Sequence, residues 1–184
     1  MPKTVDFYRD ADKRITLRYS GLFDFDGMYA AIVDWAKNYG YMYHEADFKH
    51  KVPSPSGAEQ EFKWILTKKV TEYLKYEIWI TVHMWDLLEV EVEENGKKKP
   101  LSNARLYLWI DGKIHYGPGM FGEMYKESKF AATLGKWYDK LLSRDQDQYF
   151  DQLYYRLWGL HAILKKYFDM QAKKHPYKGY LGEN

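Results

Sequence analysis

Residues 74–85, LKYEIWITVHMW, sort their side chains into two sets with a period of two. Successive side chains of a β-strand point to opposite sides of the sheet, so this stretch predicts a strand with one core-facing side and one mixed, aromatic side. The core-facing set is Leu74, Tyr76, Ile78, Ile80, Val82 and Met84, and the other set, which begins at the preceding residue, is Tyr73, Lys75, Glu77, Trp79, Thr81, His83 and Trp85.

A stretch further along the chain shows the same division, with Ala104, Leu106, Leu108 and Ile110 opposite in direction to Arg105, Tyr107 and Trp109. Two hairpin turns are predicted near it. Asn95-Gly96 suits a two-residue type I′ turn, which would set Glu94 opposite Lys97 and Glu93 opposite Lys98. Asp111-Gly112 offers the same turn between residues 107–110 and 113–116.

Upstream, the sequence predicts a strand followed closely by a helix. Ile15, Leu17 and Tyr19 alternate with polar residues, which is typical of a half-buried strand. Over residues 25–39 the apolar side chains recur every three or four positions, and Gly40 follows as a left-handed C-cap, so an amphipathic helix is expected there. Residues 41–52 are expected to be extended, 53–57 to form a turn or loop, and 59–94 to be almost wholly β.

Beyond residue 119 the pattern becomes helical to about residue 170. The recurring apolar residues are Phe130, Leu134, Trp137 and Leu141, and then Phe150, Leu153, Leu157, Leu160, Leu164 and Tyr167. Capping-box pairs at 143–148 predict one long helix with a break there, or two helices that meet there. We therefore expect an α+β fold, an antiparallel sheet with an N-terminal helix and a long C-terminal helix packed on one face. It should form a single domain over 1–172, with a loosely ordered tail at 173–184.

The composition of the 184 residues is typical of a globular protein, with 46% hydrophobic and 29% charged residues. A net charge of +2 does not favour nucleic acid as a partner, because affinity for nucleic acid rests largely on basic surface. The absence of cysteine excludes disulfides, thiolate metal ligands and cysteine nucleophiles. We find neither a secretory signal nor a membrane span, so a cytoplasmic protein is expected.

The phrase LFDFDG at residues 22–27 resembles the first motif of the haloacid dehalogenase superfamily. The resemblance implies Asp24 as a nucleophile, Asp26 as a general acid, and Mg²⁺ on the carboxylate. That chemistry needs a parallel sheet with alternating strands and helices, whereas a long β-only stretch follows here. We therefore interpret the match as a chance one, with Asp24 or Asp26 as the N-cap of the predicted helix.

The histidines and the glycine-containing loops do not predict catalysis. His44 and His50 lie in an extended stretch about 20 Å apart by strand rise, too far for one ion, and His161 flanks the apolar stripe of the last helix. Serine-nucleophile, dinucleotide-binding and P-loop motifs are all missing from the sequence. We expect no catalytic residue, no metal and no cofactor.

The order of elements resembles that of helix-grip domains, the START and Bet v 1-like superfamily. The resemblance is carried by a strand at 15–19, a helix at 25–39, strands between 59 and 116 and a helix from 128. It implies a curved sheet around the last helix, with a hydrophobic small molecule bound between them. Our candidate ligand-binding residues are Trp64, Trp79, Trp85, Tyr107, Trp109, Trp137 and Tyr138.

The aromatic side of the sheet leaves two alternatives open. If it faces solvent, it exposes more aromatic surface than a monomer usually shows, which suggests a ligand, a partner or a second copy. If the sheet curls, or the loop around Pro53 covers it, these residues line an interior. Our first hypothesis is a non-enzymatic domain that binds a hydrophobic small molecule. The second is an interaction module that forms a homodimer through the aromatic face or through the stripe at 150–167.

Overall fold

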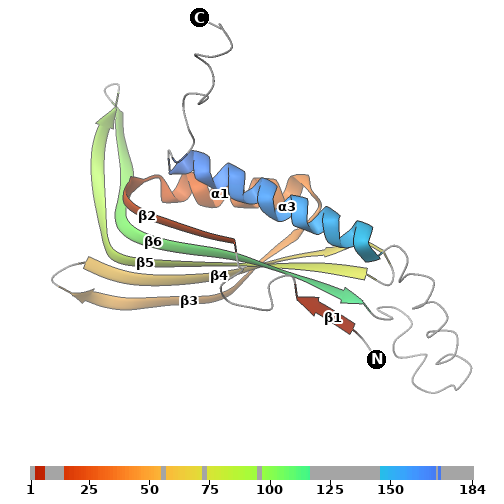
Figure 1. Cartoon of the computed structure of the whole chain (residues 1–184). Helices are drawn as coiled ribbons and strands as arrows, with labels where there is room; N and C mark the ends of the chain where they lie inside the picture. Colours follow the sequence, from red (N-terminus) through yellow and green to blue (C-terminus); the bar gives the residue numbers. More distant parts are fainter. Residues whose placement is uncertain are drawn as a thin grey trace, which may run out of the picture.

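The computed structural model describes residues 3–6, 15–54, 57–71, 74–94, 97–116, 146–168 and 170. Among these residues, two strands precede the first helix, and four consecutive strands lie between it and the second helix (Figure 1). The elements are β1 (Lys3–Asp6), β2 (Ile15–Phe23), α1 (Phe25–Asn38), β3 (Met42–Ser54), β4 (Gly57–Lys69), β5 (Leu74–Glu94), β6 (Lys97–Tyr116) and α3 (Gln146–Tyr167). The predicted helix over 128–142 and the predicted tail at 173–184 lie outside the described residues.

The strands form one antiparallel sheet. β3, β4, β5 and β6 lie side by side in chain order, so β4, β5 and β6 each pair with the strand that precedes them. The other side of β6 receives two strands from the N-terminal part of the chain. β2 pairs with residues 102–110 of β6, and β1 pairs with residues 113–116. β6 is therefore hydrogen-bonded on both sides along most of its length.

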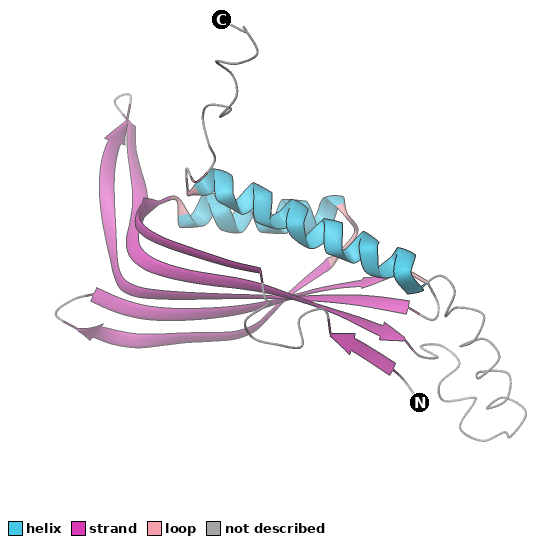
Figure 2. Ribbon diagram, in the orientation of Figure 1, coloured by secondary structure: helices cyan, strands magenta, loops and turns pink. Residues whose placement is uncertain are grey.

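Both described helices lie on the same face of the sheet (Figure 2). The side chains that the sequence assigns to the core in β5 and β6 point toward them, and none of these side chains is more than 3% exposed. One cluster of buried residues joins the sheet to α1 and α3. Full burial of one large apolar side chain is worth about 1.5–3 kcal/mol, so this layer stabilises the whole arrangement. The predicted α+β fold, with an N-terminal and a C-terminal helix on one face, is confirmed.

Neither described helix is long and apolar enough to cross a membrane.

Four leucines fix α3 to the sheet. Leu153, Leu157, Leu160 and Leu164 are all 0% exposed. The buried hydroxyl of Tyr76 on β5 adds a polar contact, because it lies 2.9 Å from the backbone carbonyl of Tyr149 in the first turn of α3. The leucines that dominate the stripe at 150–167 therefore belong to the core and are not available as a surface for self-association.

Helix α1 ends as the sequence predicts and is held against α3. Gly40 adopts a left-handed conformation with φ +71°, and the N–H groups of Gly40 and Tyr41 donate to the carbonyls of Lys37 and Ala36. The guanidinium of Arg156 on α3 stacks 3.8 Å from the ring centroid of Tyr39 at this end of α1. The two helices are thus joined at the C-cap of α1.

The two predicted hairpins have different outcomes. The register around 95–96 is confirmed, since Glu94 pairs with Lys97 and Glu93 with Lys98. The hairpin at Asp111-Gly112 is wrong, because β6 runs straight through both residues and Gly112 pairs with Ile78. The glycine serves packing instead. A Cβ at residue 112 would lie 2.8 Å from Cδ1 of Leu157, so α3 approaches β6 too closely for a larger residue.

We predict that Gly112→Val lowers the free energy of unfolding by about 1–3 kcal/mol, because the added methyl groups collide with a fully buried leucine. Gly159→Ala is the matched control. No heavy atom lies within 4 Å of a Cβ built there, and alanine is the better helix former, so a gain of about 0.5–1 kcal/mol is expected. Chemical denaturation measures both, and an unchanged midpoint for Gly112→Val would contradict the proposed close contact.

Candidate functional site

The stretch at residues 22–27 that resembles the haloacid dehalogenase motif forms the N-cap of α1. Asp24 immediately precedes α1, and its Oδ1 accepts a hydrogen bond from the N–H of Gly27 at 2.8 Å. Its Oδ2 lies 2.6 Å from Nζ of Lys99 on β6. Lys99, and secondarily the Gly27 N–H, hold the pKa of Asp24 below its ordinary value of 3.8. Both carboxylate oxygens are therefore occupied by structural contacts, and the predicted capping role is confirmed.

The predicted ligand-binding residues do not lie together. Trp64 is fully buried on the helix side of the sheet, where its ring packs near those of Phe25, Tyr29 and Phe62. The other four described members lie on the opposite side, which we call the outer face, and are partly buried: Trp79, Trp85, Tyr107 and Trp109. Trp137 and Tyr138 lie outside the described residues. The outer face is thus where most of the described candidates gather.

Within the outer face, Trp79 is held by its neighbours. Its Nε1–H donates to Oε1 of Glu77 at 2.6 Å, and Nζ of Lys113 sits 5.4 Å from its ring centroid. Trp85 is held differently, because its ring stacks on His83 at 3.8 Å between centroids, and His83 in turn contacts the carboxylate of Glu59. Among the described residues the indole N–H of Trp85 has no hydrogen-bond partner. The indole N–H of Trp79 is therefore hydrogen-bonded within the sheet, whereas that of Trp85 receives no acceptor from the described part of the chain.

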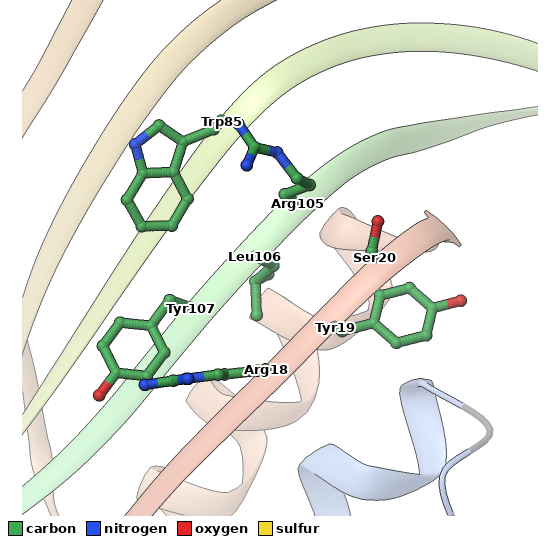
Figure 3. A pocket seen from close by; sticks show the side chains of 7 residues that line it. All are labelled: Arg18, Tyr19, Ser20, Trp85, Arg105, Leu106 and Tyr107. Atoms are coloured by element: carbon green, nitrogen blue, oxygen red, sulfur yellow. The ribbon is translucent and has the colours of Figure 1, made fainter.

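An open groove of about 510 Å³ lies beside Trp85 on the outer face (Figure 3). Three strands build it: β2, β6 and β5. Leu106 lies at the floor, although its side chain is buried on the helix side of the sheet, and Tyr19 is directed away from the other lining side chains in Figure 3. The residues that line the groove are Arg18, Tyr19, Ser20, Trp85, Arg105, Leu106 and Tyr107.

Strand register explains why these residues meet. Arg18 pairs with Tyr107 across β2 and β6, and two positions further Ser20 pairs with Arg105. Trp85 on β5 is the other neighbour of Arg105. Side chains two residues apart share one face of a strand, so these five side chains form two adjacent rows across the three strands.

A β-bulge in β5 shapes the edge of the groove. The pairing with β6 shifts between Trp85 and Leu88, and Asp86 has a left-handed φ of 56°. A bulge inserts an extra residue and redirects side chains, and here Asp86 reaches the Nε of Arg105 in a short ion pair. Gly57 at the start of β4 packs against the bulge, since a Cβ there would lie 2.6 Å from the carbonyl carbon of Asp86. The bulge thus neutralises one of the two arginines.

Arg18 differs from Arg105 in its contacts. The Cζ of its guanidinium lies over the ring of Tyr107, 4.9 Å from the centroid, and Figure 3 shows the guanidinium close to this ring. Arg18 is exposed, and no described carboxylate pairs with it. The groove therefore combines two half-buried aromatic rings with one guanidinium that has no acidic partner in the described part of the chain.

Metal-ligand clusters do not occur among the described residues, where no group of three or more His, Asp or Glu side chains is arranged to hold an ion. His44 and His50 are both exposed on β3, and His50 contacts the side chain of Gln60. His161 is buried at the core edge against Trp158, and burial lowers its pKa below 6.5.

We predict that Asp24→Ala lowers the free energy of unfolding by about 1 kcal/mol through loss of the N-cap, and that Asp24→Asn costs less because asparagine caps equally well. Because the folded-state pKa of Asp24 is lowered, the carboxylate stabilises the fold above pH 3.8 and loses this effect as the pH falls through the lowered pKa. The difference between wild type and Asp24→Asn should therefore shrink below pH 3.8. Urea denaturation at several pH values measures it, and equal losses for both variants at neutral pH would contradict the capping role.

Sequence reasoning found Trp85 and Tyr107 but missed Arg18, Ser20 and Arg105 as parts of one site. The missing information is the pairing of β2 with β6, which joins residues nearly ninety positions apart. An available signal was the period of two, which places Arg18 and Ser20 on one face of β2. No protein-family model, curated protein or solved structure matches this chain.

Proposed function

We propose that this protein is a non-enzymatic binding module that takes a planar, hydrophobic small molecule in the groove on the outer face. The observation that carries the proposal is the position of Trp85 and Tyr107. Both rings flank an open groove on the side of the sheet that faces away from both described helices. Binding sites commonly combine apolar and aromatic walls with a few placed polar groups, and this groove has that composition.

The proposal keeps the ligand class that the helix-grip likeness implies but places the site on the other face. Between the sheet and the helices, side chains from both layers bury one another, as Trp64 and the leucines of α3 illustrate. A ligand there would have to displace packed core side chains. A ligand on the outer face would instead contact rings that are already partly exposed.

Self-association through the outer face is the second candidate. Three apolar side chains near the groove support it, since Leu22 is 46%, Leu88 52% and Val90 36% exposed. Leu22 and Leu88 both neighbour Asn103 across the sheet, so they share one row. Exposed apolar side chains beside aromatic rings are a feature of protein interfaces.

We predict that Trp85→Ala weakens binding of a neutral planar probe, 2-naphthamide, at least tenfold, because the indole forms one wall of the groove. Trp79→Ala is the matched control on the same face, and it should leave the affinity within twofold. The measurement is an NMR titration. It follows the Trp85 indole N–H signal, assigned from a Trp85→Phe variant, in the proteins that keep Trp85, and the backbone amide signal of the groove residue Ser20 in every protein.

A titration in which the Trp85 signal does not move, or in which both alanine variants bind alike, would contradict the small-molecule proposal. Native mass spectrometry of the purified protein then tests the second candidate. A dimer that Leu88→Glu converts to monomer would favour self-association through the outer face, whereas a monomer at high concentration would oppose it.

A further inference from the structure

The basic side chains around the groove differ in whether an acidic side chain pairs with them. Arg105 is paired with Asp86, which the bulge in β5 brings to the outer face. His83 contacts Glu59, whose pKa is lowered by Lys51 and by His83. Arg18 has no such acidic partner among the described residues. The groove therefore has one guanidinium available for an anion that the described part of the chain does not supply.

The stacking of Arg18 on Tyr107 positions this guanidinium. The Cζ of Arg18 lies 4.9 Å from the centroid of the Tyr107 ring, and no N–H of the guanidinium donates to another described residue, so its planar fork keeps its donors. Those groups match the two oxygens of a carboxylate or two oxygens of a phosphate. A cation–π contact at an exposed position is worth only about 0.5–1 kcal/mol, so it orients the side chain without occupying its donors.

The spacing of the two rows suits a ligand with an aromatic part and one anionic group. Arg18 and Ser20 lie on β2 two residues apart, which is about 7 Å by strand rise. Trp85 lies beyond Arg105 in the second row. A fused aromatic ring that extends from Tyr107 toward Trp85 would bring a substituent at its Tyr107 end to Arg18 (Figure 3).

We infer that the groove selects a planar aromatic ligand that carries one anionic group, a carboxylate or a phosphate ester, and that Arg18 binds this group while Trp85 and Tyr107 hold the ring. The inference rests on the proposed function, because it names the ligand class of the same groove. One anionic group is expected rather than two, since Asp86 already neutralises Arg105.

The test compares two probes of nearly equal shape, 2-naphthoate and neutral 2-naphthamide, by NMR titration of the Trp85 indole signal. Wild type should bind the carboxylate about three- to tenfold more tightly, as expected for one charge-assisted contact at an exposed site. Arg18→Gln should reduce that ratio to about one by weakening the binding of the carboxylate more than that of the amide. Arg18→Lys, which keeps the charge but loses the planar fork, should give an intermediate ratio.

Arg156→Gln is the matched control, because Arg156 is also stacked on a tyrosine but lies on α3 at the C-cap of α1. It removes the same charge and should preserve the ratio. If Arg18→Gln leaves the ratio as in wild type, or weakens both probes equally, the anionic inference is overturned while the binding proposal stands. If neither probe moves the Trp85 signal in the wild-type protein, both fail.

Discussion

The period of two along β5 and β6 is the constraint on which the rest of the structure depends. It gathers the apolar side chains of two long strands on one face, and two helices bury that face. The side chains on the opposite face therefore do not contribute to the core. The charged and aromatic side chains there are arranged in cross-strand contacts instead, such as the pairing of His83 with Glu59 and the stacking of Arg18 on Tyr107. Core and candidate site are thus two sides of one alternating pattern.

The fold was predictable where local signals agreed with long-range packing. Asn95-Gly96 is flanked by strands with complementary charges, and its register is the predicted one. Asp111-Gly112 carries a similar turn signal, yet the chain stays extended because α3 passes close over residue 112. A glycine that permits a turn and a glycine that makes room for a neighbouring helix look the same in sequence. Only the position of Leu157 distinguishes them.

The candidate site was predictable only in part, for a related reason. Aromatic residues stand out in a sequence, so Trp85 and Tyr107 were identified, but Trp64 was identified with them although it lies in the core. Arg18 and Arg105 become neighbours only through the pairing of β2 with β6. Asp86 lies beside Arg105 because of a β-bulge, and no residue type in this stretch predicts that bulge. When the residues of a site lie on strands that are not consecutive in sequence, the site can be recognised only after the strand order is known.

The openness of the groove has a kinetic consequence. Two of its three strands, β5 and β6, are hydrogen-bonded on both sides, β2 pairs with β6, and the buried residues of the core lie on the other face. A ligand would reach such a surface without a preceding opening of the fold, so association should approach the rate set by diffusion and orientation. Ligands of similar size would then differ in affinity mainly through their dissociation rates. An enclosed cavity, by contrast, would slow both entry and exit.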